Sequence, residues 1–353
     1  MILEGKRILI TGGTGSLGKV LTKRILSGEA GKPKKVIIFS RDEAKQHDMR
    51  MEYQHRRVAT DEVIYHNFEE LLEFCIGDVR DYHSVSSVMR RADIVFNAAA
   101  LKQVPSCEYF PYEAVRTNIE GAENIVRVIR ELAIPVETVV GISTDKACKP
   151  VNIMGMTKAI QERVFLSANI TCPKTRFVCV RYGNVLASRG SVIPLFHEQI
   201  KNGGPITITT EQMTRFLLSL DQAVDVIFGV LRQGKAGETF IPKAPAARIV
   251  DIAQALIDGR PIEIKVVGIR PGEKVHEILI SEEECHRSIE RGSFYAIRPI
   301  LPELDHDKDS KPVFTTEYSS AMNLLSTQQT KTLLKDHRLT IEQAANQGGE
   351  LLR

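Results

Sequence analysis

The feature that most constrains the fold is a series of short apolar runs in the first half of the chain. Each run has four to eight residues, is rich in Ile, Val and Phe, and is nearly continuous rather than alternating. Parallel strands covered on both faces have this pattern. Between the runs lie segments with helical spacing, such as Leu17, Val20, Leu21 and Ile25. The alternation predicts an α/β fold with a Rossmann-like, doubly wound parallel sheet. The predicted strands are residues 7–11, 36–40, 72–76, 94–98, 136–143 and 176–180.

The rhythm changes after about Tyr182. Strand-like runs at 206–209, 239–242 and 263–267 alternate irregularly with helical patterns at 192–201, 221–232 and 249–258. This pattern predicts a smaller C-terminal α/β lobe. The polar segment 304–312 is typical of a surface loop, and the remaining tail is mostly helical and polar. A chain of 353 residues agrees with about two domains, at ~150 residues each.

Composition excludes several classes of protein. The net charge of +3 is evenly spread, aromatic residues are 6% and Trp is absent, so no nucleic-acid partner is expected. No run approaches the ~18 apolar residues of a membrane-spanning helix, and a strand-like run almost at Met1 predicts no signal peptide. The six cysteines contain no CxxC and the nine histidines no HxxxH or HExxH, which predicts free thiols and no metal. These features favour a cytoplasmic protein.

A glycine-rich loop, TGGTGSLG (11–18), lies directly between the first predicted strand and the first predicted helix. Glycine there lets a pyrophosphate approach the backbone, and the helix start offers free N–H groups and a positive dipole end. A glycine pattern alone can mark only a tight turn, but its place between strand and helix favours a dinucleotide site. The loop residues expected to bind the dinucleotide are Gly12, Thr14, Gly15, Ser16, Leu17 and Gly18.

The end of the second predicted strand indicates which dinucleotide binds. NAD sites place a carboxylate there for the ribose 2′-hydroxyl, whereas an arginine accommodates the 2′-phosphate of NADP. Here Ser40 and Arg41 occupy the place, and a guanidinium matches a phosphate with two directed bonds. We therefore expect NADP, with NAD as the alternative. Further expected cofactor contacts follow the third and fourth strands: Asp78, Val79, Ala98, Ala99 and Ala100.

These signals divide the chain into three predicted parts. Residues 1–182 form an NADP-binding Rossmann domain, to which later helical segments return. Residues 183–300 form a substrate-binding lobe, and residues 301–353 a polar tail in which 315–334 suggest contacts between subunits.

Longer motifs add a resemblance to a known family. TGGTGSLG, GDV, NAAA, a Ser-Thr pair and RYGNV follow successive predicted strands in the order of the extended short-chain dehydrogenase/reductases. AAALKQVP (98–105), STDKA (143–147), RYGNVLASRGSVIP (181–194), MTRF (213–216) and RPGEKVHE (270–277) resemble its bacterial polysaccharide-biosynthesis branch. That branch contains the UDP-N-acetylglucosamine 4,6-dehydratases, and the resemblance covers about residues 5–300.

The resemblance implies a lyase reaction on a UDP-sugar. A base takes the proton of the sugar 4-hydroxyl while the C4 hydride moves to NADP+. The 4-ketone then acidifies the C5 proton, water leaves from C6, and the hydride returns to C6. NADP is recycled, which explains why a net dehydration needs a nicotinamide.

One position departs from the superfamily pattern of Tyr-x-x-x-Lys, because Met154 and Lys158 stand at that spacing. A tyrosine acts there as a phenolate, whereas a thioether has no proton to exchange. Either the protein is inactive, or Tyr182 substitutes, or Asp145 and Lys146 move the protons while Lys158 holds the nicotinamide ribose. Met for Tyr, with STDK retained, resembles a subgroup that inverts C5 and begins the UDP-N-acetyl-L-fucosamine route to capsule and O-antigen. This likeness favours the third interpretation.

In that interpretation Thr144 hydrogen-bonds the sugar 4-oxygen and Asp145 is the acid for the departing 6-hydroxyl. Lys146 is the base at C5 and reprotonates it, with a pKa that burial, Lys158 and NADP+ are expected to lower toward neutrality. The alternative for Asp145 and Lys146 is a surface pair that begins a loop. The sequence does not identify the group that deprotonates the 4-hydroxyl.

Candidate residues for the rest of the UDP-sugar lie mostly in the C-terminal lobe. Asn184 is expected at the diphosphate or sugar, and Ser191 and Val192 near the uridine. Arg215 and Arg270 are expected to clamp the diphosphate, because an arginine fork makes two directed bonds. Glu273 is expected to take the uridine ribose hydroxyls, and Lys102 to face the sugar.

Other functions share parts of this pattern. A UDP-hexose or UDP-N-acetylglucosamine 4-epimerase has the same fold and hydride step, but epimerases normally hold NAD and keep the tyrosine, so Arg41 and Met154 argue against it. A C5-retaining dehydratase and a non-catalytic NADP-binding protein are further alternatives. The resemblance also implies a homo-oligomer.

Overall fold

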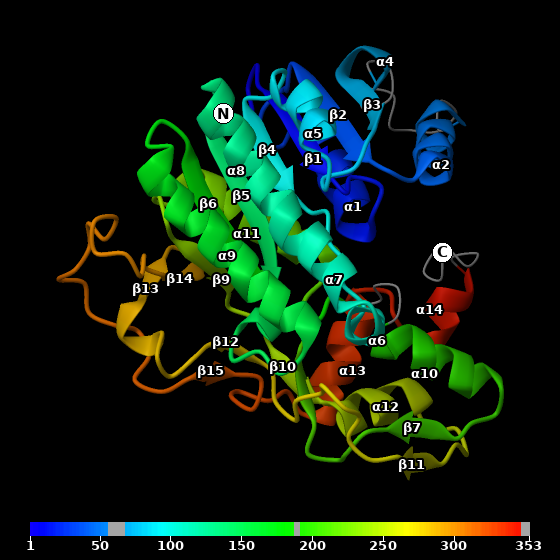
Figure 1. The fold of residues 1–353 in the computed structure, drawn as a ribbon. Helices are drawn as coiled ribbons and strands as arrows, with labels where there is room; N and C mark the ends of the chain where they lie inside the picture. Colours follow the sequence, from blue (N-terminus) through cyan, green and yellow to red (C-terminus); the bar gives the residue numbers. More distant parts are fainter. Residues whose placement is uncertain (56–67, 187–190, 347–353) are drawn as a thin grey trace.

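The computed structural model describes residues 1–55, 68–186 and 191–346 (Figure 1). Within these ranges the largest sheet has nine strands in the order β13-β14-β9-β6-β5-β4-β1-β2-β3. The strands from β3 to β9 in this order are parallel, and β14 and β13 are antiparallel additions at one edge. The predicted doubly wound parallel fold is confirmed.

The six predicted strands of the first half are all present. β5 and β6 extend beyond their apolar runs, so that Thr144 and Tyr182 are still paired in register. The carboxyl ends of parallel strands meet at one edge of the sheet, where doubly wound folds bind their ligands. The strands are β1 (Arg7–Thr11), β2 (Lys35–Ser40), β3 (Leu72–Ile76), β4 (Ile94–Asn97), β5 (Thr138–Thr144) and β6 (Arg176–Tyr182).

Helices cover both faces of this sheet. Alternate side chains of a strand point to opposite faces, so Ile8 and Ile10 of β1 join one apolar core while Leu9 joins the other. Burying a side chain of this size stabilises the fold by ~1.5–3 kcal/mol. The first core is covered by α1 (Ser16–Leu26), α2 (Glu43–His55) and α11 (Leu220–Gln233). The second is covered by α5 (Tyr82–Met89), α8 (Gly121–Leu132) and α9 (Ile153–Thr171), of which α8 and α9 lie in front of the sheet in Figure 1.

The second half of the chain divides its elements between this sheet and a separate lobe. Helical returns are predicted, and α11 is one, but the strands β9 (Thr239–Pro242), β13 (Ser288–Arg291) and β14 (Phe294–Ile297) also join the main sheet. The lobe, around the core residues Ile193, Phe196 and Ile252, lies at the lower right of Figure 1. Its elements are α10 (Val192–Lys201), β7 (Ile206–Ile208), β8 (Thr214–Phe216), β10 (Ala246–Arg248), α12 (Ile249–Ile257) and β11 (Ile264–Val266).

The tail packs on its own chain. β15 (Tyr318–Ser319) pairs antiparallel with β12 (Ile278–Ile280), and α13 (Thr327–Asp336) buries Leu334 in the lobe core. These contacts use much of the segment 315–334 that the sequence predicts at subunit interfaces. The remaining short helices are α4 (Phe68–Leu71), α6 (Val104–Tyr109), α7 (Pro111–Ala114) and α14 (Ile341–Asn346), with a π-helix at Val115–Glu120 and 3-10 turns at Asp145–Ala147 and Cys285–Arg287.

Two searches of the described residues bear on the class of protein. In these ranges no helix combines the length and the apolar character needed to cross a bilayer. The same residues contain no group of three or more His, Cys, Asp or Glu side chains able to hold a metal ion.

Candidate active site

The glycine loop forms a tight backbone turn between β1 and α1. Gly12 has a φ of +65°, a conformation that favours glycine. A Cβ on Gly12 would lie 2.8 Å from the backbone nitrogen of Ala99, and one on Gly18 would lie 2.4 Å from the carbonyl oxygen of Gly13. The loop therefore has room only for backbone where β1, β4 and α1 meet. The residues present fit a pyrophosphate at the start of α1, where Gly15 is the N-cap.

Polar side chains at the ends of β2 and β3 surround the next part of this edge. Thr14 Oγ1 donates a hydrogen bond to Ser40 Oγ at 3.3 Å. The Arg41 side chain is 57% exposed, and its Nη1 lies 3.7 Å from Asp78 Oδ2. Asp78 is bound more closely by Arg80, at 2.6 Å, and the pKa of Asp78 is lowered because its hydrogen bonds and charge contacts with Arg80 outweigh its burial. Arg41 therefore keeps an exposed guanidinium suited to a phosphate.

The catalytic candidates follow β5 directly. Asp145 and Lys146 lie in a 3-10 turn that Thr144 caps by accepting the backbone N–H of Lys146. Asp145 is 0% exposed, and Thr144 Oγ1 donates to its Oδ1 at 2.9 Å. Asp145 is thus buried, whereas the Lys146 side chain is 21% exposed, so the alternative of a surface pair is wrong for Asp145.

Three oxygens face the Lys146 ammonium. Its Nζ lies 3.1 Å from Asp145 Oδ1, 3.3 Å from Asn184 Oδ1 and 3.4 Å from Glu277 Oε1. Glu277 is 2% exposed, and its Oε1 also lies 3.7 Å from Arg215 Nε. Glu277 is absent from the sequence predictions, although it ends the motif RPGEKVHE. Glu277 is far from Lys146 in the sequence, so the contact between them could not be predicted from the sequence.

The charges of this cluster differ from the expectation for Lys146. Burial opposes its charge, but Asp145 and Glu277 outweigh burial and raise the pKa of Lys146 above its usual value. The expected lowering toward neutrality is therefore wrong in the protein alone, since two carboxyl groups face the ammonium. Burial raises the pKa of Asp145. For Glu277, Lys146 and Arg215 outweigh burial and lower the pKa.

The superfamily pair on α9, Met154 and Lys158, is also buried. Burial lowers the pKa of Lys158 to about 8, and its Nζ donates to the Ile142 carbonyl at 2.5 Å and to Gln161 Oε1 at 2.7 Å. Met154 packs in a small apolar cluster with Cys107 and Ala114. Tyr182 is 8% exposed and burial raises its pKa, which argues against its use as a phenolate base.

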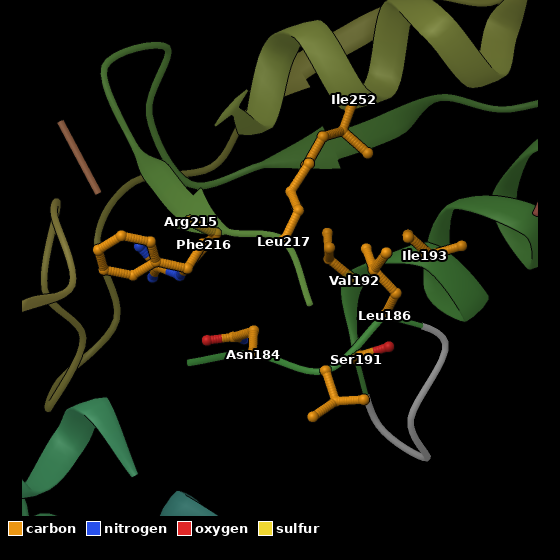
Figure 2. Close-up of a pocket in the computed structure, with 10 residues that line it drawn as sticks. Asn184, Leu186, Ser191, Val192, Ile193, Arg215, Phe216, Leu217 and Ile252 are labelled. Atoms are coloured by element: carbon orange, nitrogen blue, oxygen red, sulfur yellow. The ribbon is translucent and has the colours of Figure 1, made fainter. Parts of the chain in front are cut away.

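A small hollow brings four predicted substrate residues together (Figure 2). Asn184, Ser191, Val192 and Arg215 all line it. Figure 2 shows Arg215 and Phe216 on one side and Val192 and Ile193 on the other. The sequence predictions omit the apolar lining residues Val185, Leu186, Ile193, Phe216, Leu217 and Ile252. These residues resemble ordinary core positions in sequence, and only the fold turns them toward a shared space.

Arg215 is largely engaged within the protein. Its Nη1 donates to the carbonyls of Thr214 at 2.7 Å and Val275 at 3.2 Å, and its Nη2 to that of Lys274 at 3.1 Å. These contacts tie β8 to the segment that ends in Glu277. The diphosphate contact expected of Arg215 stays a prediction.

The other predicted residues lie in two surface segments. Arg270 is exposed, and Glu273 Oε2 accepts from the Arg270 backbone N–H at 3.3 Å and from Thr209 Oγ1 at 3.4 Å. Asn152, the N-cap of α9, donates to the Gly272 carbonyl at 2.8 Å, so this turn is fixed to α9. Lys102 is exposed between β4 and α6.

Comparison with known proteins identifies the family. Residues 8–299 match the family described as polysaccharide biosynthesis protein. The chain belongs to this family. The resemblance inferred from its motifs, to the polysaccharide-biosynthesis branch of the extended short-chain dehydrogenase/reductases, is confirmed.

Individual family relatives carry two different names. The chain is 43% identical over 307 residues to the UDP-N-acetylglucosamine 4,6-dehydratase (inverting) of Campylobacter jejuni, covering 86% of each chain. It is 42% identical over 325 residues to a UDP-glucose 4-epimerase of Rickettsia typhi, covering 89% of this chain and 91% of the relative.

Solved structures support the same fold. Pen from Bacillus thuringiensis is 35% identical with a TM-score of 0.84, covering 96% of this chain and 100% of Pen. DesIV, a dTDP-glucose 4,6-dehydratase from Streptomyces venezuelae, has a TM-score of 0.63 over 76% of this chain and 86% of its own; at 20% identity it shows the fold alone.

Proposed function

We propose that this protein is an NADP-dependent UDP-N-acetylglucosamine 4,6-dehydratase that inverts C5, acting in capsule or O-antigen sugar biosynthesis. The observation that carries the proposal is the contact of Lys146 with both the buried Asp145 and Asn184 of the hollow, while Met154 lies in an apolar cluster. The relatives' names support the coarser assignment to nucleotide-sugar dehydratases and epimerases. The inverting dehydratase name on the Campylobacter jejuni relative supports the finer one.

The proposed cofactor site is the glycine loop with Thr14, Ser40 and Arg41. A bound nicotinamide would supply reversible hydride acceptance, which makes the sugar transiently a 4-ketone. Arg41 favours NADP through its exposed guanidinium. NAD is the alternative, because it is bound in structures of the same fold, including DesIV. Lys158, whose Nζ donates to the Ile142 carbonyl of β5, would contact the nicotinamide ribose.

Asp145 is proposed as the acid for the 6-hydroxyl. Burial raises the pKa of Asp145, which favours the protonated carboxyl group that can transfer its proton to the departing oxygen. Thr144 would hydrogen-bond the sugar 4-oxygen. Lys146 would take the C5 proton during elimination and, as the ammonium so formed, return a proton to C5 afterwards, directly or through water; the carboxyl groups that raise its pKa favour that ammonium.

The hollow lined by Asn184, Ser191 and Val192 is proposed to hold the UDP end of the substrate. Its apolar lining suits a base ring, and Asn184 also contacts Lys146, so the same residue links the nucleotide end to the catalytic cluster. Arg215 and Arg270 would neutralise the diphosphate, Glu273 would bind the uridine ribose and Lys102 would face the sugar. We also infer that the protein forms a homo-oligomer in the cytoplasm.

A UDP-sugar 4-epimerase is the second candidate, favoured by the Rickettsia typhi relative. The two reactions differ only after the 4-ketone forms, because an epimerase returns the hydride to C4 and releases no water. Loss of water therefore requires an acid at C6, the role proposed for Asp145.

Proton NMR in D2O separates the candidates, with purified protein, UDP-N-acetylglucosamine and catalytic NADP+. The expected result is a new upfield methyl signal, deuterium at C5 and the couplings of an L-arabino 4-keto sugar. Interconversion of gluco and galacto sugars without a methyl signal would establish the epimerase. A methyl signal with retained C5 geometry would mean a retaining dehydratase, and no turnover despite cofactor binding would overturn the catalytic assignment.

A further inference from the structure

Two buried carboxyl groups share the Lys146 ammonium, but their surroundings are unequal. Glu277 has two cations within 4 Å, with Lys146 Nζ at 3.4 Å and Arg215 Nε at 3.7 Å. Asp145 has only Lys146 Nζ, at 3.1 Å, among the ion pairs of the described residues. Two neighbouring carboxyl groups out of contact with water do not both ionise readily, so one proton tends to remain on the pair.

Each of the two carboxyl groups also has one buried oxygen without a hydrogen-bond partner among the described residues, and the Asp145 oxygen lies toward the hollow. Asp145 Oδ2 and Glu277 Oε2 are buried and have no hydrogen-bond partner within the described chain. Asp145 Oδ2 borders Gly183, where an added Cβ would lie 3.1 Å away. Gly183 adjoins Asn184, which lines the hollow. An unpartnered oxygen at this place is suited to donate a proton to a bound group.

The other groups around the two carboxyl groups also favour Glu277 as the ionised one. Lys274, which donates to the Cys148 carbonyl, contributes positive charge that lowers the pKa of Glu277. His276, next to Glu277, contacts Thr214 Oγ1 through Nδ1 at 2.8 Å. The Glu277 backbone N–H donates to Ser320 Oγ at 2.9 Å, so the carboxylate is held at the start of β12. Tertiary structure thus presents Glu277, rather than Asp145, to most of the positive charge.

We propose that Glu277 is a positioning residue that carries the permanent negative charge of this cluster and thereby keeps the proton on Asp145. This inference rests on the proposed dehydratase function, in which Asp145 is the acid at C6. Glu277 neutralises Lys146, so Asp145 is not required as its counter-ion. The pair therefore divides its tasks, with Glu277 as the anion and Asp145 as the acid.

Neutralising Glu277 tests this division. In Glu277→Gln the ammonium of Lys146 retains only Asp145 as an ionised partner, so Asp145 loses its proton at lower pH. The alkaline limb of the kcat–pH profile moves to lower pH by about one unit or more. At pH 7.5 kcat falls by up to ~10-fold for each pH unit that the limb moves, because one pKa unit changes the protonated fraction at most tenfold, while KM changes less than ~3-fold.

Two further variants serve as controls. Glu277→Asp keeps the charge and restores the wild-type position of the limb, even where its shorter side chain lowers kcat. Glu290→Gln removes an exposed carboxylate on β13 that pairs with Lys243, and leaves the profile unchanged. An unshifted limb in folded Glu277→Gln, or a shift equally large in Glu277→Asp, would overturn the proposal.

A spectroscopic measurement separates this inference from the proposed function. Infrared difference spectra of the protein, taken across pH, should contain the band of a protonated carboxyl group that Asp145→Asn removes. Glu277→Gln should move the titration of this band to lower pH, whether or not the protein turns over substrate. A wild-type protein without dehydratase activity but with this shift would refute the function alone. An active wild-type whose Asp145 band is insensitive to Glu277→Gln would refute the inference alone.

Discussion

Two regions lie at the same edge of the main sheet: the glycine loop between β1 and α1, and the charged cluster after β5. They differ in which atoms form them. In the loop, backbone atoms define the space, and Gly12 meets the Ala99 backbone with no side chain between them. In the cluster, side chains define it, and Asp145, Lys146, Asn184 and Glu277 come from three separate segments of the chain. A local motif builds the first, whereas long-range packing builds the second.

This difference determines which substitutions should damage each region. A site formed by backbone atoms loses binding or stability when an added atom fills its space or strains its turn. A site formed by charged side chains loses its chemistry when one proton or one charge is removed, even though its shape is unchanged. Substitutions at the two regions should therefore separate binding and stability from chemistry.

The largest effect should come from Asp145→Asn. The amide is nearly the same size but cannot donate the proton required at C6, so kcat falls by ~10²–10⁴-fold. NADP+ binding, measured by fluorescence or calorimetry, should stay within ~2-fold of wild type, on the expectation that distant sites act independently. Asp309→Asn, an exposed change, should behave as wild type. Turnover near the wild-type rate in Asp145→Asn would remove the cluster from the chemistry.

A pH effect should follow from Lys158 on α9, whose Nζ donates to the Ile142 carbonyl of β5. Its pKa is about 8 in the folded protein because of burial, below the usual 10.5. The unfolded chain therefore binds the proton more tightly, and this penalty on folding is full below pH 8. It disappears as pH rises from 8 to 10.5, at ~1.4 kcal/mol per unit of pKa difference, or ~3 kcal/mol in all.

Chemical denaturation between pH 7 and 10.5 checks this sign. Wild type should gain stability with rising pH relative to Lys158→Met, which lacks the titrating group. A difference between the two proteins that stays constant with pH would contradict the burial of an ionisable Lys158.

Gly12→Ala should damage the region formed by backbone atoms, and Gly28→Ala is its matched control. Both glycines have positive φ, but only at Gly12 would a Cβ collide with backbone, since nothing lies within 4 Å at Gly28. Gly28→Ala should lose only ~1–2 kcal/mol of stability from the left-handed conformation. Gly12→Ala should lose ~1–3 kcal/mol more through overpacking, and NADP+ affinity should fall by at least ~10-fold, or ~1.4 kcal/mol. Equal losses of thermal stability and equal NADP+ affinity in the two variants would contradict the predicted collision at Gly12.

The smallest effect should come from Arg41→Gln. Its guanidinium is exposed, so loss of a charged contact to the 2′-phosphate should weaken NADP+ by ~10-fold or less. Binding of NAD+, which lacks that phosphate, should change little. Arg90→Gln removes an exposed positive charge elsewhere and is the control. Equal weakening of both dinucleotides would assign Arg41 to their shared part.

The sequence by itself determined those features of the protein that depend only on residues close together along the chain. Six continuous apolar runs specify parallel strands because both faces must be buried, and glycines between the first strand and helix specify close backbone approach. The STDK segment places Asp145 and Lys146 after β5, and the motif pattern identifies the family. Each of these signals is contained in a short stretch of chain.

Only tertiary structure decided the electrostatics of the cluster. Sequence reasoning counted Lys158 and NADP+ near Lys146 but could not place Glu277, which reaches it through the pairing of β12 with β15 and the contacts of Arg215. Apolar residues such as Ile252 likewise line the hollow only because the lobe packs them there. A pKa depends on every charge within a few ångströms and on the exclusion of water, and both are properties of the folded chain rather than of any segment.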